Sequence, residues 1–222
     1  MEGRDVTPQR EQWDKTYSNK EDHFGKEPSQ LVKDAVNLFR ERGVKTVLEL
    51  GCGQGRDTWY LLKNGFEVSA LDYSEIGVAQ MRECAEITGV KVVLMALDAR
   101  QGLPFSDASF DAVYSHMFFT MEFTESEVAT LMAECYRVLR PGGLNVYSVR
   151  NFNDQHYGKF MPAGEDMWRN PLGFVVHFYS MQAIRRLSRG YEILHINEFE
   201  DGSPPSVKKL YEVVLERHSG ER

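Results

Sequence analysis

The chain lacks the long apolar runs and the paired cysteines that mark several large classes of protein. No hydrophobic stretch of its 222 residues approaches the ~20 residues that a bilayer-spanning helix needs. The three cysteines, Cys52, Cys84 and Cys135, are far apart and form no C-x-x-C pair. That spacing argues against a disulfide framework and against a structural zinc site. We therefore expect no membrane partner.

Clusters of positive charge are also missing. The formal net charge is -7, and lysine and arginine form no run along the chain. A nucleic-acid-binding domain normally leaves a basic footprint. The N-terminal segment 1–5 is polar and lacks the apolar centre of a signal peptide. These features predict a cytoplasmic protein with no nucleic-acid partner.

Short β-like runs alternate with helix-like stretches from Thr46 onward, which is typical of a mainly parallel sheet covered by helices. Apolar residues at helical spacing predict helices over 29–42 and 125–140, and Pro141 with two glycines ends the second. A turn is predicted at 201–205. The remaining predicted elements are a helix near 181–187 and strands near 46–50, 66–71, 91–95, 110–114, 144–149, 191–196 and 210–215.

The sharpest local signal is the segment Glu49-Leu50-Gly51-Cys52-Gly53-Gln54-Gly55, which lies between a predicted strand and a predicted helix. Glycines permit a tight turn and a close approach of backbone to ligand. The N–H groups of the following helix can bind an anionic group. The third glycine comes one position too early for a dinucleotide-binding loop. A tight turn without any ligand is the alternative.

Two aspartates follow the next two predicted strands. Asp72 lies 21 residues after Gly51, where an acid of a βαβ unit can accept hydrogen bonds from a ribose. Asp98 follows the third strand and could accept from an adenine amino group, with the backbone N–H of Ala99 facing the ring. A solvated strand-end aspartate is the alternative for either position. The order of loop, first acid and second acid favours a nucleoside site.

These segments resemble the motifs of class I methyltransferases that depend on S-adenosyl-L-methionine (SAM). Segment 49–55 resembles the first motif, Leu71-Asp72-Tyr73-Ser74 the second, Asp98-Ala99 the third and Phe110–His116 the fourth. Segment 137–143 is similar to the turn before the fifth strand. The resemblance extends from about Trp13 to Leu215. It implies a single domain over 1–222 with an α/β fold: a Rossmann-like, mostly parallel seven-stranded sheet, helices on both faces and an antiparallel C-terminal strand.

The N-terminal segment narrows this resemblance. Trp13-Asp14-Lys15-Thr16-Tyr17, with 24–29 after it, resembles the leader of the small-molecule branch that includes tellurite-resistance and thiopurine-type methyltransferases. There the leader, here residues 1–30, folds over the SAM site. Packing of Trp13 on the sheet is the alternative. The cofactor contacts that the resemblance implies are Trp13, Tyr17, Glu49, Gly51, Cys52, Gly53, Asp72, Tyr73, Asp98, Ala99, Ser115 and His116.

The implied reaction is in-line methyl transfer from SAM to a small-molecule acceptor, which leaves S-adenosyl-L-homocysteine. His116 is the candidate general base, because an imidazole titrates near neutrality; an orienting or packing role is the alternative. Metal-dependent relatives place an aspartate where Ser115-His116 stand here, so we expect no metal. The cysteines also form no arsenic-binding cluster.

Segment 151–179 is a long aromatic-rich insertion at the place where this family builds substrate lids. We expect it to cover the acceptor, with His156, Tyr157, Trp168 and His177 as lining; simple extension of the core is the alternative. Two other functions remain open from sequence alone: a non-catalytic SAM-binding regulator or partner subunit, and a nicotinamide-dependent oxidoreductase. The sequence indicates neither the accepting atom nor the oligomeric state.

Overall fold

The apolar segment between two turns, Thr46–Leu50, forms strand β1 near the centre of a large sheet in the computed structural model, which describes residues 7–219. Residues 1–6 and 220–222 of the predicted domain lie outside this range. Because side chains alternate along a strand, Val47 packs into the core on one face of the sheet and Leu48 into the core on the other. Both are fully buried.

Five parallel strands form the half of the sheet that the sequence predicts best. Their spatial order is β3 (Val93–Ala96), β2 (Glu67–Asp72), β1, β4 (Phe110–His116) and β5 (Leu139–Asn151). The carboxyl ends of β1, β2 and β4 therefore meet at one edge, where ligands of open α/β sheets bind. Strand β5 begins directly after the preceding helix, but its pairing is irregular at 140–143. Leu139 pairs with Phe110 and Leu144 with Ala112, and Gly142 between them has a positive φ of 77°, so the chain does turn there.

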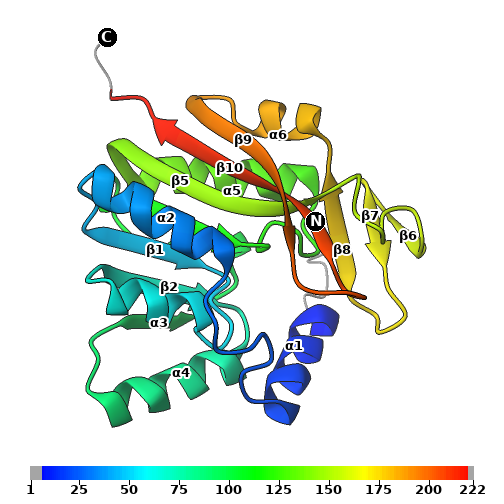
Figure 1. Cartoon of the computed structure of the whole chain (residues 1–222), viewed down its shortest axis with the longest axis horizontal. Helices are drawn as coiled ribbons and strands as arrows, with labels where there is room; N and C mark the ends of the chain where they lie inside the picture. Colours follow the sequence, from blue (N-terminus) through cyan, green and yellow to red (C-terminus); the bar gives the residue numbers. More distant parts are fainter. Residues whose placement is uncertain (1–6, 220–222) are drawn as a thin grey trace.

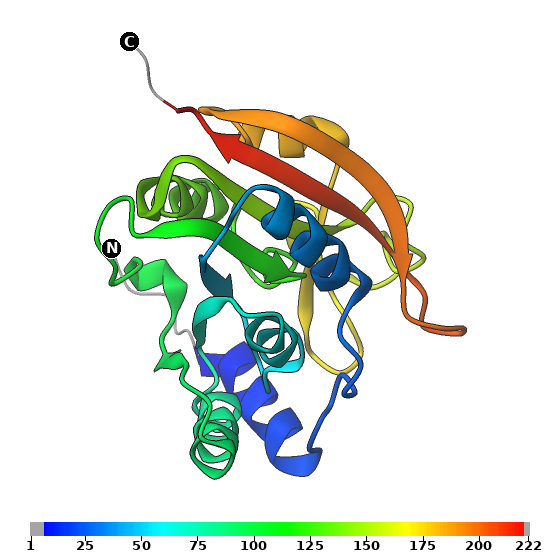
Figure 2. The ribbon, with the colours of Figure 1, turned by 60° about the vertical axis from the view of Figure 1, so that its left-hand side comes forward.

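The C-terminal strands extend this sheet in the opposite direction. Strand β10 (Lys208–Arg217) lies antiparallel between β5 and β9 (Tyr191–Asp201), and the long hairpin curves past the rest of the sheet in Figure 2. The path β3-β2-β1-β4-β5-β10-β9 is the seven-stranded sheet that the resemblance implies, with β10 antiparallel to both of its neighbours. This arrangement confirms the predicted fold class.

Within residues 7–219 the sheet has ten strands, so the predicted number is too low. The three additional strands come from the insertion: β6 (Met161–Gly164), β7 (Met167–Arg169) and β8 (Val175–Tyr179). Strand β8 pairs in parallel with the end of β5 and in antiparallel with β7. The segment showed no periodicity because two of these strands are only three or four residues long and positive-φ residues separate them.

Helices cover both faces of the sheet, as Figure 1 shows. The apolar residues of α2 (Gln30–Glu41), α3 (Arg56–Lys63) and α4 (Glu75–Thr88) join one buried cluster, and those of α5 (Glu125–Val138) and α6 (Met181–Leu187) join the other. Side-chain caps fix where several helices start. Ser29 caps α2, Ser74 caps α4, and Thr124 with Glu127 forms a capping box on α5.

Helix α1 (Thr7–Asn19) packs beside α4 rather than on the central strands (Figure 1). Asp14 accepts hydrogen bonds from the Ser74 hydroxyl (2.5 Å) and the Ile76 amide (3.3 Å), at the start of α4. Arg10 pairs with Glu75 on the same turn. Within residues 7–219, no helix is long and apolar enough to cross a membrane.

Candidate functional site

A cavity of about 1060 Å³ lies where the carboxyl ends of β1, β2 and β4 meet. Helix α1 and the insertion also contribute to its wall. Eleven of the twelve predicted cofactor contacts line it: Trp13, Tyr17, Glu49, Gly51, Cys52, Gly53, Asp72, Tyr73, Asp98, Ala99 and His116. The twelfth, Ser115, is fully buried beneath the surface of the cavity and does not line it.

The glycine loop is shaped by close contacts with aromatic side chains. Gly51 and Gly53 have positive φ angles of 74° and 55°, which favour glycine. A Cβ on Gly51 would lie 2.8 Å from Cδ2 of Phe118, and one on Gly53 would lie 2.7 Å from the Tyr17 hydroxyl. Both glycines are therefore required by space as well as by backbone conformation.

Asp72 ties this loop to the end of β2. Its carboxylate accepts hydrogen bonds from the amides of Gly53 (2.9 Å) and Ser74 (2.8 Å). Burial raises the pKa of Asp72 to about 6, although these amides oppose the shift. Each carboxylate oxygen can still accept a second hydrogen bond, so the group can bind a ribose while it holds the loop.

Asp98 lies at the same end of the cavity but is already engaged. Arg100 binds both of its carboxylate oxygens, with Nε at 2.9 and 3.0 Å and Nη2 at 2.7 Å. An adenine amino group would therefore share this carboxylate with a guanidinium. Sequence alone did not reveal the competition, because Arg100 reaches back two positions within a short 3₁₀ turn.

A buried network of acids lies under the glycine loop. Glu49 accepts a hydrogen bond from the Thr58 hydroxyl (2.5 Å). Burial, reinforced by the nearby Asp57 carboxylate, raises the pKa of Glu49 to about 8. Asp57 behaves in the opposite way. Burial opposes its ionisation, but Arg56, His116 and hydrogen bonds from Ser29 hold its pKa below the ordinary value. Asp57 is thus the charged partner of the two near neutrality.

Glu49→Gln is expected to change how the stability of the ligand-free protein depends on pH. A carboxyl whose pKa is raised in the folded state stabilises the protein fully below its unfolded pKa, and the contribution is lost as pH rises through the folded pKa. Wild type should therefore lose stability relative to the variant between pH 5 and 8, by on the order of a few kcal/mol. Chemical denaturation at several pH values measures the difference; a constant difference would contradict the assignment.

His116 ends β4 and is one of the residues that line the cavity, although its side chain is almost completely buried. Its Nδ1 lies 2.9 Å from the Ser148 hydroxyl, and that oxygen also accepts the Met117 amide at 3.0 Å. Met117 has a positive φ of 57°, an uncommon conformation of the kind found at functional sites. On the other side of the ring, Nε2 lies 3.8 Å from a carboxylate oxygen of Asp201.

The sequence analysis missed Asp201, which it read only as the start of a turn. The His116 ring, followed by the Lys208 ammonium, holds the pKa of Asp201 well below its ordinary value in spite of partial burial. Sequence analysis also missed Arg56, Asp57, Arg150 and Lys208, all of which line the cavity. These residues come from α3, β5 and β10, and no local motif marks them.

The N-terminal helix connects the cofactor side of the cavity with the insertion. The Gln9 side chain accepts the Val175 amide (2.8 Å) and donates to the Val175 carbonyl (3.4 Å). Trp13 packs against Phe174, with ring centroids 4.8 Å apart, and against Tyr17 at 5.4 Å. Trp13 therefore lines the cavity and does not pack on the sheet surface.

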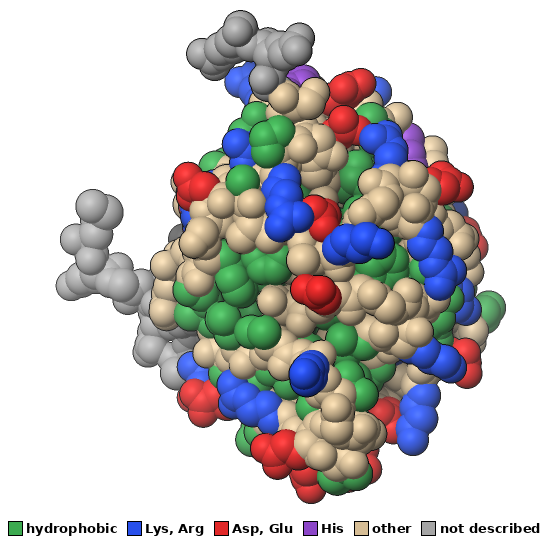
Figure 3. Space-filling model, turned by 90° about the vertical axis from the view of Figure 1, so that its left-hand side faces the viewer, with side chains coloured by type: hydrophobic (Ala, Val, Ile, Leu, Met, Phe, Trp, Pro, Cys, Tyr) green, Lys and Arg blue, Asp and Glu red, His purple; other side chains and the backbone are tan. Residues whose placement is uncertain are grey.

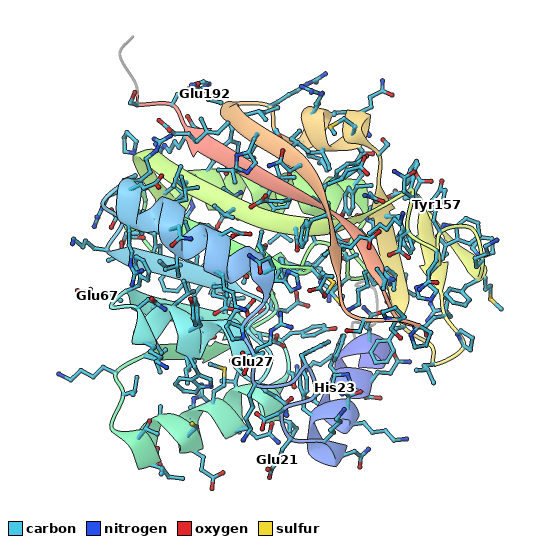
Figure 4. The ribbon with its side chains drawn as sticks, in the orientation of Figure 1. Glu21, His23, Glu27, Glu67, Tyr157 and Glu192 are labelled. Carbon is cyan, nitrogen blue, oxygen red and sulfur yellow. The ribbon has the colours of Figure 1, made fainter. Side chains whose placement is uncertain are left out.

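None of the four predicted substrate residues lines the cavity. Tyr157 stacks on Phe152 at 4.2 Å and meets the edge of Trp168 at 5.9 Å. Figure 4 places Tyr157 among the strands of the insertion, far from His23 on the α1 side. His156 lies against Arg150, and His177 is buried with its Nδ1 2.7 Å from the Phe123 carbonyl oxygen.

The prediction for these four side chains is thus not supported by the geometry. Segment 169–176 of the same insertion does reach the cavity, and its lining residues are Arg169, Asn170, Leu172, Phe174, Val175 and Val176. The prediction selected residues by aromatic or histidine type. The phase of short strands, which decides the face that each side chain occupies, could not be read from the segment.

Comparison with known proteins shows which class this chain is similar to. Residues 47–143 match the family described as "Methyltransferase domain". This match confirms the resemblance to class I SAM-dependent methyltransferases, whose cofactor is SAM. The match favours this class over a nicotinamide-dependent oxidoreductase.

Particular relatives among the curated proteins are enzymes of several kinds. A fatty-acid O-methyltransferase of Mycolicibacterium smegmatis is 37% identical over 134 residues, which cover 55% of this chain and 45% of the relative. The probable SAM-dependent methyltransferase TehB of Haemophilus influenzae is 26% identical over 59% of this chain and 45% of the relative. A tRNA N(3)-methylcytidine methyltransferase of Schizosaccharomyces pombe is 27% identical over 61% and 47%. The chain spans less than half the length of these relatives.

Solved structures share the fold at low sequence identity. The 1,6-didemethyltoxoflavin-N1-methyltransferase of Burkholderia thailandensis, solved with 1,6-didemethyltoxoflavin and S-adenosylhomocysteine, has a TM-score of 0.72 at 18% identity, with 98% of this chain and 93% of that chain covered. The [4+2]-cyclase SpnF has a TM-score of 0.61 at 20% identity, with 84% and 81% covered. At such identities, the likeness shows the fold alone.

Proposed function

We propose that this chain transfers a methyl group from SAM to a small-molecule acceptor. The observation that supports this most strongly is the loop of Gly51 and Gly53, held by the buried Asp72 carboxylate at the rim of a cavity of about 1060 Å³. Positive-φ glycines and a buried acceptor of hydrogen bonds fit the backbone-lined half of a nucleoside site. Relatives named as fatty-acid and malonyl-[acyl-carrier protein] O-methyltransferases favour a small acceptor.

We assign the cofactor contacts along the carboxyl edge of the sheet. Gly51, Cys52, Gly53 and Glu49 would contact the methionine part, and Asp72 with Tyr73 the ribose. Asp98 and Ala99 would contact the adenine. Tyr17 and Trp13 would cover the cofactor from α1. Since the Ser115 side chain does not reach the cavity, its contribution would come from the backbone.

Positioning and exclusion of water would account for the catalysis. When bound, SAM supplies a methyl group already activated by a sulfonium, so this chain has to align the acceptor and keep the site dry. Helix α1 and segment 151–179 would cover the cavity, because Gln9 and Trp13 of the helix contact Val175 and Phe174 of that segment. We also propose that 1–222 is one domain, since the insertion strands continue the same sheet.

A small acceptor is proposed in preference to RNA, although one relative is a tRNA methyltransferase. The net charge is -7, and acidic and basic side chains are interspersed on the face shown in Figure 3. Tight binding to nucleic acid depends on phosphate contacts from clustered cations.

The test is calorimetry with SAM, followed by an assay of S-adenosylhomocysteine release with a panel of thiols, amines, phenols, carboxylates and metalloid anions. We expect SAM to bind and one acceptor class to release the product. Failure to bind SAM, together with binding of NADH, would overturn the proposal. SAM binding with no product from any acceptor would favour the non-catalytic regulator.

A further inference from the structure

The end of the cavity beyond His116 is rich in hydrogen-bond donors. Arg56, Arg150 and Lys208 line it from three different elements. Arg56 binds Asp57 through Nε and Nη2, and Arg150 uses the same two atoms on its own partners. The Nη1 groups of both arginines make no hydrogen bond within residues 7–219. Lys208 has one acidic neighbour, Asp201, at 3.5 Å.

The acids at this end have little accepting capacity left. Asp57 accepts from the Ser29 amide and hydroxyl and from the Tyr114 hydroxyl, in addition to Arg56. Asp154 accepts twice from Arg150 and also from the amides of His156 and Lys209. Two outer acids of the lining are paired as well, Asp22 with Lys26 and Glu122 with Arg169. Asp201, between His116 and Lys208, is the one exception among these.

Hydrogen bonding also determines which nitrogen of His116 carries the proton. The Ser148 oxygen accepts the Met117 amide, and within residues 7–219 its one other hydrogen-bond partner is His116 Nδ1, so we assign the Ser148 hydroxyl as the donor of that bond. Nδ1 therefore accepts, and the neutral ring carries its hydrogen on Nε2. Nε2 is buried at the cavity and has no hydrogen-bond partner among the described residues. His116 is thus arranged as a donor, which differs from the expected general base.

Taken with the function proposed above, on which this inference rests, we propose that the methyl acceptor is a small-molecule carboxylate. One carboxylate oxygen accepts hydrogen bonds from His116 Nε2 and Lys208, and an arginine Nη1 donates to a lone pair of the other oxygen. The other oxygen attacks the methyl carbon of SAM. The carbon–sulfur bond breaks with its electron pair left on sulfur, and the products are a neutral methyl ester and S-adenosylhomocysteine. No proton is released, so no base is needed.

Asp201 is the positioning residue of this arrangement. It places a negative charge beside the His116 ring and the Lys208 ammonium, and so keeps both donors at the cavity. An amine acceptor at this end would instead face three cations, beside Asp201, while the exposed Glu27 is a further acid of the cavity lining. An amine acceptor would therefore need hydrogen-bond acceptors and negative charge where these residues supply donors and positive charge.

A matched set of acceptors distinguishes the two classes. The full chain with SAM is offered octanoate, octanamide, octylamine and octanol, and the same four groups on a phenyl ring. We expect methyl ester and S-adenosylhomocysteine from carboxylates alone, and carboxylate binding to the protein saturated with S-adenosylhomocysteine. Turnover of an amine or alcohol, or a failure of every carboxylate both to bind and to react, would overturn this inference. Turnover of an amine or alcohol alone would leave the proposed methyl transfer standing. Methyl transfer itself would fail if SAM did not bind, or if no acceptor of any class released S-adenosylhomocysteine.

Lys208→Met tests the donor set, with Lys209→Met as its control. Both variants remove one ammonium from the same hairpin, but Lys209 is half-exposed and pairs with Glu200. We expect Lys208→Met to weaken carboxylate binding or raise its KM roughly tenfold or more, as for a lost charged hydrogen bond. SAM affinity should stay within about twofold in both variants. Equal effects of the two substitutions on the carboxylate would contradict the inference.

The variant His116→Gln distinguishes a role of His116 as hydrogen-bond donor from a role as general base. Glutamine retains an N–H near the position of Nε2, so turnover should fall less than about tenfold, whereas loss of a general base costs about 10²- to 10⁴-fold. Independently of activity, ¹⁵N NMR of the whole chain should show that the His116 ring is protonated at Nε2 and unprotonated at Nδ1. The His116 signals are identified because they are missing from the spectrum of the His116→Gln variant. A protonated Nδ1 in the neutral ring would overturn the donor role.

Discussion

Asp72→Ala is expected to weaken SAM binding by about 100-fold or more. The substitution removes the proposed ribose acceptor and leaves the amides of Gly53 and Ser74 without their partner. Hydrogen bonds to a charged group contribute about 1.5–3 kcal/mol each, and a buried donor left unsatisfied adds to the loss. Calorimetric titration of the variant with SAM measures the effect. Asp72→Asn, which retains one accepting oxygen, should be intermediate.

The matched control is Asp111→Ala. Asp111 also accepts two backbone amides, those of Lys45 and Thr46 at 2.9 Å, but it lies near the amino end of β4 and does not line the cavity. We expect that variant to lose stability and retain SAM affinity. If both variants lost affinity in proportion to their loss of stability, Asp72 would have only a structural role, and the ribose assignment would be wrong.

Gly53→Ala is expected to lower SAM affinity by roughly tenfold or more, and Tyr17→Phe should restore part of that loss. The new Cβ would lie 2.7 Å from the Tyr17 hydroxyl but 3.4 Å from the ring carbon that bears it. Removing the hydroxyl therefore relieves most of the overlap. The four proteins of a double-mutant cycle, titrated with SAM, measure this coupling. Strictly additive effects would show that the contact with α1 does not shape the loop.

Gly89→Ala is the control for backbone strain. Gly89 has a positive φ of 68°, close to the 55° of Gly53, but a Cβ there meets nothing within 4 Å. An alanine at either position adopts a conformation that costs on the order of 1–2 kcal/mol. Only the Gly53 variant should affect the cofactor. Equal weakening of SAM binding by both would contradict the contact mechanism.

The cofactor half could be predicted from sequence because its residues follow the ends of consecutive strands. Parallel pairing of β1, β2 and β4 brings Gly51, Asp72 and His116 to one edge without further information. The seven-stranded core, with its antiparallel C-terminal strand, was expected from the family resemblance. Leader residue Trp13 was found only through the family resemblance, since nothing in its own segment indicates a position over the cavity.

The acceptor half could not be predicted, because long-range pairing creates it. Arg56, Arg150, Asp201 and Lys208 come together only after β10 has inserted between β5 and β9. Each charge is unremarkable in its own segment. The aromatic residues of the insertion misled the prediction, because rings such as Tyr157 and Trp168 pack on one another and not on the cavity.

In the hairpin of β9 and β10, the charge pair of the site depends on the register of the strands, whereas the loop at the tip is exposed and independent of that pair. Asp201 and Lys208 lie directly opposite one another in its register, so a slip of one residue would turn these side chains to the other face of the sheet. Segment 202–206 between them is exposed, and exposed loop tips tolerate inserted residues well. Evolution or engineering could therefore graft a longer tip there, and so extend the outer rim, without disturbing the charge pair or the nucleoside end.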